Sequence, residues 1–207
     1  MRKFLLLIFL FGALGANAQS YTRIKDPTDC KKKINASATN TLTISAKFKE
    51  EVFSSMFNST KIGTGILKYK KDNKIRWEHF APKKQIVLIN GTKVRMQEDG
   101  HEVKNAASNQ IIKKVQSLMI QLFSGEFLNE REFKISYFEN SESYKLILVP
   151  KSSRMSKYIA SVEMIFNKKT LKLSQMTLKE SDADKIVYSF SNVTFNGELS
   201  DTNFTKF

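Results

Sequence analysis

The chain has 207 residues, a formal net charge of +14 and a single cysteine. This length fits one domain with a substantial core, and a single cysteine excludes an internal disulfide. So basic a protein suggests nucleic acid as a partner only if it stays in the cytosol, and the export signal described next points instead to anionic lipid or an acidic protein. Because the charges are spread along the chain, an ordinary solvated surface is the alternative.

Residues 1–18 have the pattern of a secretory signal peptide. Two basic residues precede an apolar run over residues 4–14, and a small-residue cleavage site ends at Ala18. The alternative, a membrane anchor, would need a run of about 20 apolar residues. No cysteine for lipid attachment follows the cleavage site. We therefore expect export, cleavage near Ala18 and one domain over residues 19–207.

A helix followed by a long strand is expected next. Asp26-Pro27 is typical of a helix start, since proline suits the first turn and an acidic residue suits the positive end of the helix dipole. From Thr41 the hydrophobic period changes to two, which predicts a strand with one apolar face. That face carries Leu42, Ile44, Ala46 and Phe48. The alternation is disturbed at Glu50-Glu51, which indicates a bulge.

Residues 63–96 predict four short strands joined by tight turns. Polar residues 71–74 suit one hairpin, Pro82 ends the next strand, and Asn90-Gly91 suits a type I′ turn. The predicted apolar face carries Leu67, Tyr69, Ile75, Trp77, His79, Ile86, Leu88, Val94 and Met96. The opposite, wet face carries Lys68, Lys70, Arg76 and Glu78.

Residues 108–123 predict an amphipathic helix in mid-chain. One face carries Leu118, Met119 and Leu122, and lysines and glutamines lie opposite. A helix of this kind between two groups of strands should cover a sheet surface. Its simplest interpretation is an ordinary core helix.

The last third predicts a meander of antiparallel strands with short connections. Their apolar positions include Tyr144, Leu146, Met164, Met176, Tyr188 and Phe190. Val193 and Phe195 take the opposite parity, which predicts a bulge before Asn196-Gly197.

The sequence offers little for catalysis or metal binding. The only histidines, His79 and His101, have no cysteine or acidic partner at metal-ligand spacing, and nucleophile or phosphate-loop motifs are absent. We therefore expect no catalytic residue, no metal site and no cofactor. An enzyme of unrecognised type remains the alternative, and a buried pair of acidic or histidine side chains converging in a cleft would support it.

One series of residues carries a family resemblance. It comprises Gly65-Ile66-Leu67, a basic pair at Lys70-Lys71, Arg76-Trp77, Pro82, an apolar strand and the turn at Asn90-Gly91. This order resembles the LolA family of periplasmic lipoprotein carriers, and Asp201 ahead of Phe204 resembles the family's closing segment.

The resemblance implies an α+β fold, in which an antiparallel incomplete β-barrel has an apolar concave face covered by short helices. It also implies a monomeric periplasmic carrier that holds the acyl chains of lipoproteins. Such a carrier would take cargo from an inner-membrane lipoprotein-releasing transporter and pass it to an outer-membrane acceptor. A LolA-like envelope lipid sensor or structural binding module without a transport role is the alternative function.

With the resemblance, helix 108–123 becomes a lid over a hydrophobic ligand cavity. The expected cavity residues are Leu42, Ile44, Phe48, Leu67, Tyr69, Ile75, Trp77, Leu88, Met96, Leu118, Met119, Leu122, Tyr144, Leu146 and Met164. In the family a basic residue on the second strand holds the lid closed, and Lys71 occupies the corresponding position. The family has Arg followed by Pro there, whereas Asp72 follows Lys71. Lysine lacks arginine's fork of donors. Arg76 is a second candidate, although it lies on the wet face.

Overall fold

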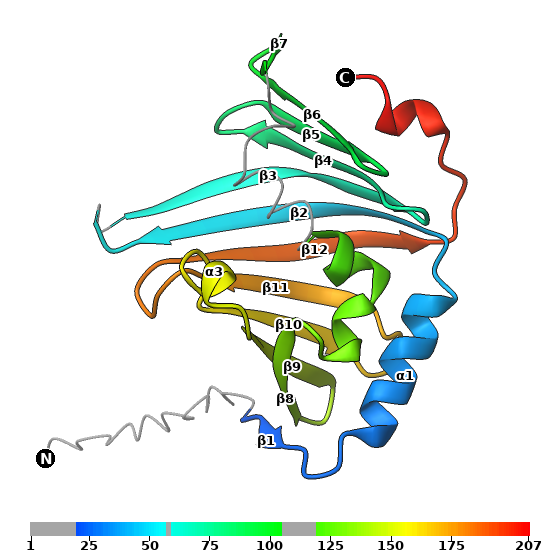
Figure 1. Ribbon diagram of the computed structural model, residues 1–207, viewed down its shortest axis with the longest axis vertical. Helices are drawn as coiled ribbons and strands as arrows, with labels where there is room; N and C mark the ends of the chain where they lie inside the picture. Colours follow the sequence, from blue (N-terminus) through cyan, green and yellow to red (C-terminus); the bar gives the residue numbers. More distant parts are fainter. Residues whose placement is uncertain (1–19, 57–58, 105–118) are drawn as a thin grey trace, which may run out of the picture.

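The computed structural model describes residues 20–56, 59–104 and 119–207. These residues form one antiparallel sheet in the order β1-β8-β9-β10-β11-β12-β2-β3-β4-β5-β6-β7 (Figure 1). The two outermost strands do not pair with each other, so the sheet stays open. The predicted incomplete antiparallel barrel with a few covering helices is therefore confirmed.

The described elements have the following bounds. The strands are β1 (Thr22–Arg23), β2 (Thr43–Ser54), β3 (Ser59–Lys70), β4 (Lys74–Ala81), β5 (Gln85–Asn90), β6 (Lys93–Glu98), β7 (His101–Glu102), β8 (Phe133–Glu139), β9 (Ser143–Pro150), β10 (Ser161–Asn167), β11 (Leu173–Lys179) and β12 (Lys185–Phe195). The helices are α1 (Thr28–Thr39) and α3 (Ser153–Ser156), and the 3-10 turns are η2 (Glu126–Asn129) and η3 (Asp201–Phe204). Residues 119–124 are also helical.

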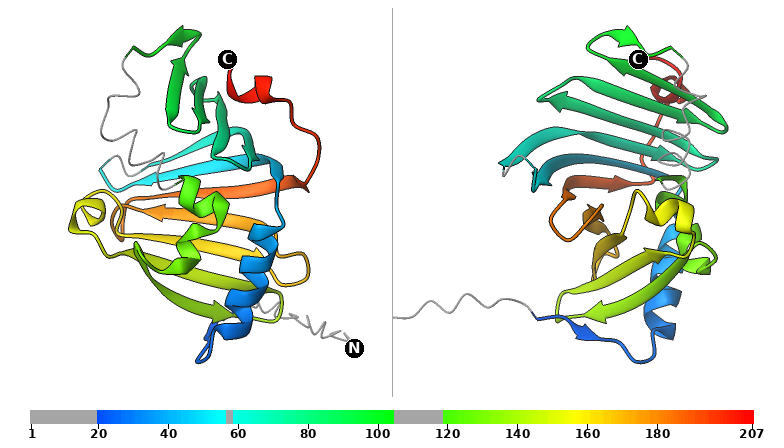
Figure 2. Two further views of the ribbon diagram at one scale, coloured as in Figure 1. Left: turned by 45° about the vertical axis from the view of Figure 1, so that its right-hand side comes forward. Right: turned by 60° about the vertical axis from the view of Figure 1, so that its left-hand side comes forward.

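The helix α1 starts close to the predicted position. The carboxylate of Asp26 accepts hydrogen bonds from the backbone N–H and the hydroxyl of Thr28, at 3.0 and 2.6 Å, which satisfies a donor at the helix start. Cys30 and Ile34 are both buried, as their helical spacing suggests. Together with residues 119–124, α1 covers one end of one sheet face (Figure 2). We call this the concave face and the opposite one the convex face.

Gly125 sets how closely the two covering segments approach each other. Its φ of +80° is a left-handed conformation that glycine adopts without strain, and a Cβ built there would lie 2.6 Å from the Cβ of Ala38 in α1. A larger residue would therefore push the two segments apart.

Two details of the strands differ from expectation and one agrees. β2 pairs with β3 without a register shift from Thr43 to Ser54, so the bulge expected at Glu50-Glu51 is wrong. The bulge expected near Val193 is confirmed, since the β12–β2 register shifts between Ser191 and Thr194. The hairpin after β5 turns at Gly91, with φ +61°, and Asn90 still pairs in the strand, so the turn is not the predicted type I′ Asn90-Gly91 pair.

The convex face of β3 to β6 carries the C-terminal segment, residues 198–207. Asp201 forms ion pairs with Lys70 and Lys74, at 2.7 and 2.9 Å. Arg76 donates to the backbone oxygens of Asn203 and Lys206, at 3.2 and 2.8 Å. The predicted wet face is therefore not simply solvated, because its basic side chains hold the end of the chain.

Candidate ligand-binding site on the concave face

Strand register sorts the concave side chains of β2 to β6 into rows across the sheet. The first row is Ile44, Tyr69, Ile75, Ile89 and Val94; the second is Ala46, Leu67, Trp77, Val87 and Met96; the third is Phe48, Gly65, His79, Gln85 and Glu98. Two rows are wholly apolar or aromatic, and the third introduces polar side chains. The face is therefore apolar at the end near α1 and becomes polar along the strands.

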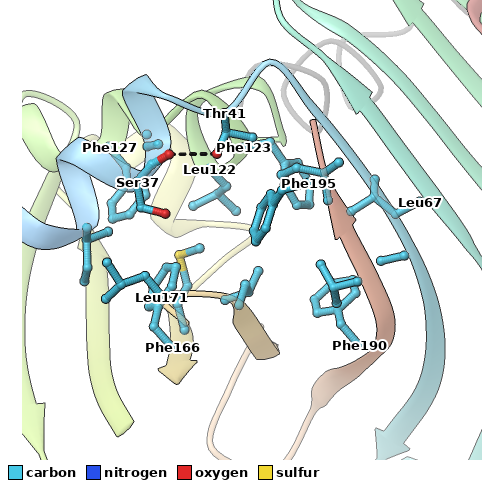
Figure 3. A pocket seen from close by; sticks show the side chains of 18 residues that line it. Ser37, Thr41, Leu67, Leu122, Phe123, Phe127, Phe166, Leu171, Phe190 and Phe195 are labelled. Atoms are coloured by element: carbon cyan, nitrogen blue, oxygen red, sulfur yellow. Dashed lines mark hydrogen bonds between the residues drawn. The ribbon is translucent and has the colours of Figure 1, made fainter. Parts of the chain in front are cut away.

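A cavity of about 60 Å³ lies beneath the covering helices at the apolar end. Ala38 of α1, Leu122 and Phe123 form part of its wall, with Leu67 of β3 and Phe195 of β12 (Figure 3). Ser37 and Thr41 are the polar residues of the lining, and the Thr41 hydroxyl donates to the Ser37 carbonyl at 2.7 Å. Sites for small ligands usually measure about 300–1,000 Å³, so side chains already fill most of this interior. A longer ligand would have to displace some of them.

An aromatic cluster forms the middle of the face around Trp77. The Trp77 ring lies 5.1 Å from Phe48, 5.0 Å from Tyr188 and 6.1 Å from Phe123, measured between centroids. Phe123 belongs to the covering segment and the other rings to the sheet. Trp77 therefore joins the cover to β2, β4 and β12.

A buried polar cluster lies just beyond these rings. Glu50 Oε1 accepts a hydrogen bond from the Tyr188 hydroxyl at 2.7 Å and lies 3.3 Å from His79 Nε2. The side chains of Glu50 and His79 are only 13% and 15% exposed. Among the described residues, the buried Nδ1 of His79 has no hydrogen-bond partner. A buried nitrogen without a partner is rare in folded proteins and calls for an explanation.

Two glycines of β3 make room for this arrangement. A Cβ at Gly63 would lie 2.8 Å from Glu50 Oε2, and one at Gly65 would lie 2.4 Å from the ring of Phe48. Both distances are too short for a real contact. The side chains of Phe48 and Glu50 therefore fold over β3 because it has no side chain at these two positions.

The protonation states follow from the surroundings. Burial raises the pKa of Glu50, but the hydrogen bonds from His79 and Tyr188 outweigh it, so this pKa lies below its usual 4.5. Burial and the nearby Glu50 charge raise the pKa of Tyr188 well above 10. At neutral pH Glu50 is thus a carboxylate and Tyr188 a neutral donor.

Most of the predicted cavity residues lie on the concave side. The buried core cluster includes Phe48, Leu67, Tyr69, Ile75, Trp77, Leu122, Tyr144, Leu146 and Met164, with Ile44 and Met119 packed against it. Met96 is partly buried and pairs with Val87 in the second row. Their role in binding a ligand stays a prediction.

Two predicted cavity residues are misplaced. Leu42 is 55% exposed, because it lies in the connection from α1 and β2 begins only at Thr43. Leu88 is buried, but on the convex face, where its neighbours across the sheet are Arg76 and Arg95. The error arose at the turn after Pro82. Because His79 pairs with Gln85, Val87 and Ile89 continue the concave face.

The structure describes only part of the predicted lid, together with both candidates for its latch. Residues 108–118 of the predicted lid helix, Leu118 among them, lie outside the described residues. Lys71 is exposed in the turn between β3 and β4, where its backbone N–H donates to the Leu42 carbonyl at 2.8 Å. Arg76 lies on the convex face and pairs with Glu78 at 2.7 Å, so the alternative latch points away from the covering helices. The role of Lys71 stays a prediction.

The polar cluster was not predicted from the sequence, although the strand pattern places its individual members. His79 continues the alternation of Ile75 and Trp77, and Glu50 that of Ala46 and Phe48. The sequence does not show that these side chains converge, because Glu50 lies 29 residues from His79 and 138 residues from Tyr188. The described residues contain no group of three or more His, Cys, Asp or Glu side chains able to hold a metal ion. In the same ranges no helix is long and apolar enough to cross a membrane.

Comparison with known proteins gives one family. The family model for the outer membrane lipoprotein carrier protein LolA matches residues 39–206. An outer-membrane lipoprotein carrier protein of Coxiella burnetii (strain CbuK_Q154) is 25% identical over 202 residues, which cover 97% of this chain and 90% of that protein. The same figures hold for the protein of that name from strain RSA 493 / Nine Mile phase I.

Solved structures with a similar course of the chain were also found. A LolA superfamily protein from Nitrosomonas europaea matches with a TM-score of 0.42 and 11% identity, covering 85% of this chain and 97% of that one. The MucA/MucB complex of Pseudomonas aeruginosa matches with a TM-score of 0.46 and 12% identity, covering 86% of this chain and 60% of that one.

Proposed function

Since the chain belongs to the LolA family, as its sequence pattern predicted, we propose that it is a periplasmic lipoprotein carrier. In this proposal the signal peptide is cleaved near Ala18, and the mature protein is a monomer without catalytic activity. It takes lipoproteins from an inner-membrane lipoprotein-releasing transporter and delivers them to an outer-membrane acceptor. The concave face holds the acyl chains on the way.

The observation that carries this proposal is the closed apolar interior. Apolar side chains of the sheet and of two covering segments meet around a cavity of about 60 Å³, which is too small for an acyl chain. Burial of a chain gains about 0.8 kcal/mol per methylene, so binding is favourable and release is the difficulty. Contacts between cover and sheet that cargo must break offset part of this gain. Such a carrier binds its cargo without trapping it.

Leu122 tests whether the cover moves. It is 5% exposed and lines the cavity, whereas Leu148 is fully buried at a distance from it. Buried leucine truncations cost about 2–5 kcal/mol, and a site beside a cavity should lie near the lower end. We expect Leu122→Ser to weaken cargo binding while Leu148→Ser reduces only the stability. Lipoprotein co-purification, measured by mass spectrometry, and urea unfolding give the two readouts.

The outcomes separate a carrier from a static core. If Leu122→Ser lost as much stability as Leu148→Ser and still bound cargo normally, the covering segment would be a fixed core element and the carrier mechanism would be wrong. If no lipid or lipoprotein co-purified even with the unmodified protein, while a stable protein complex did, the alternative of an envelope lipid sensor or structural binding module would replace it.

A further inference from the structure

The polar cluster of Glu50, His79 and Tyr188 has no role in the closing of an apolar cavity. It lies on the same face, with His79 in the third row and Glu50 two residues beyond Phe48 of that row, on the side away from the cavity. Glu50 lies four positions along β2 from Ala46 in the cavity wall, a distance of about 13 Å along an antiparallel strand. An amphiphile that lies along the face would reach from one to the other.

The cluster keeps unpaired hydrogen-bond acceptors. In the tautomer of His79 whose Nε2–H donates to Glu50, Nδ1 is an acceptor, and it is the buried atom without a partner in the described structure. The second carboxylate oxygen of Glu50, Oε2, lies over Gly63. A carboxylate has about four acceptor positions, and the bonds to His79 and Tyr188 both go to Oε1.

Charge selects the kind of group that fits these acceptors. The pKa of Glu50 lies below its usual value, so its carboxylate carries a negative charge, and the rings of Phe48 and Trp77 pack beside its partner His79. A carboxylate or phosphate there would face like charge at low dielectric, and a plain hydroxyl would leave the charge uncompensated. An ammonium or another N–H donor supplies both hydrogen bonds and a complementary charge.

We propose that Glu50, His79 and Tyr188 form a polar subsite that takes the ammonium or N–H group of a lipid whose chains lie along the concave face. The inference rests on the proposed function, because it presumes that lipid enters this face. Two sources share the chemistry: the amine of a phospholipid headgroup and the amino group at the N-terminus of a lipoprotein. Binding there fixes the depth and orientation of the cargo.

A catalytic role for the same cluster is less well supported. Among the described residues, the only hydroxyl bonded to Glu50 is that of Tyr188, whose pKa is raised well above 10, so it remains a donor and not a nucleophile. The ring of His79 packs against the rings of Phe48 and Trp77. A binding subsite accounts for all these contacts.

Trp77 makes the proposal measurable, since it is the only tryptophan and its ring lies 6.4 Å from His79. Its emission would be titrated with dodecylammonium, dodecanol and laurate below their aggregation concentrations. A hydrogen bond to a charged group is strong enough that we expect dodecylammonium to bind at least about tenfold more tightly than dodecanol. Glu50→Gln should abolish this preference and leave dodecanol binding unchanged.

Glu163→Gln is the matched control. Glu163 is 15% exposed, close to the 13% of Glu50, and its pKa is also lowered, but it lies on the convex side between Lys145 and Lys179. It should leave the preference intact. Tyr188→Phe removes one donor to the carboxylate and keeps its charge, so it should keep most of the preference even if Glu50→Gln folds poorly.

The titrations distinguish failure of the subsite from failure of the function. Equal binding of the three ligands by the unmodified protein, or a preference that survives Glu50→Gln, would overturn the subsite alone. If none of them bound, the proposed function would fail and the subsite with it. Lipopeptides with free and acetylated N-termini, and vesicles of phosphatidylethanolamine and phosphatidylcholine, then identify the source. Discrimination within either pair supports the subsite, and discrimination in neither overturns it.

Discussion

The two faces of strands β3 to β6 are held by different forces. On the concave face, Leu67, Ile75 and Trp77 are at most 3% exposed and belong to the buried core cluster, in which Trp77 packs against other aromatic rings. On the convex face, Lys70, Lys74 and Arg76 hold the C-terminal segment through ion pairs and bonds to backbone oxygens. Alternate residues of the same strands therefore build a core on one side and polar contacts to the C-terminal segment on the other. We call the contacts of Lys70, Lys74 and Arg76 with this segment the convex clasp.

The difference teaches which side determines stability. A fully buried large apolar side chain contributes about 1.5–3 kcal/mol, whereas an exposed ion pair contributes about 0–1 kcal/mol. Loss of the concave packing should unfold the sheet. Loss of the convex contacts should release a short segment that is otherwise anchored mainly by Phe204, which is 2% exposed.

The largest effect should come from Trp77→Ala. The ring is 3% exposed and contacts β2, β12 and the covering segment, so its removal leaves a cavity in the middle of the core. We expect a loss of about 3–5 kcal/mol in the free energy of unfolding, measured by urea denaturation followed by circular dichroism. A loss below about 1 kcal/mol would show that the concave face is not the main source of stability.

Phe204→Ala should have a smaller effect of a different kind. Phe204 is as buried as Trp77, but it belongs to a terminal segment that can undock without opening the sheet. We expect a loss below about 3 kcal/mol and faster amide exchange confined to residues 198–207 and the strands beneath them. Exchange that rose equally in β9 and β10 would contradict independent docking of the segment.

Asp201 gives the convex clasp a pH dependence. Hydrogen bonds from Lys70 and Lys74 lower its pKa from 3.8 to about 2. Its contribution to docking is therefore complete above pH 3.8 and is lost as the pH falls through about 2. Asp201→Asn should remove this part of the acid sensitivity, measured by amide exchange of the C-terminal segment.

The carboxylate of Asp184 provides the control for this experiment. Its pKa is also lowered, by hydrogen bonds from Ser55 and Ser181, but it lies away from the C-terminal segment. Asp184→Asn should leave the exchange of the segment unchanged. An unchanged acid response in Asp201→Asn would show that other groups hold the clasp.

Lys71→Gln should have the smallest effect on stability. The side chain is exposed, so the free energy of unfolding should stay within about 0.5 kcal/mol of that of the unmodified protein. If Lys71 is the latch of the lid, this variant should change the rate at which cargo is released to acceptor membranes. Lys169→Gln, at another exposed turn, is the control. Equal release rates for both variants would remove Lys71 from the mechanism.

The sequence by itself determined the alternation of strands, the first helix, the late bulge and the family. Period-two patterns such as Leu67 with Tyr69 record which side of a strand is dry, and proline or glycine turns mark where strands end. These are local signals, legible within a few residues. The same local reading could not say whether Val87 or Leu88 faces inward, because a one-residue change of register exchanges the two faces.

Tertiary structure alone decided the contacts between distant segments. The bond between Lys68 and Asn203 spans 135 positions, and it turns an apparently solvated face into the seat of the C-terminal segment. Leu88 is buried on that face for the same reason. The meeting of Glu50 and Tyr188 across β2 and β12 likewise depends on strand order and register. The pairing of strands that lie far apart in the chain follows from the packing of the whole sheet. No single segment of the sequence determines it.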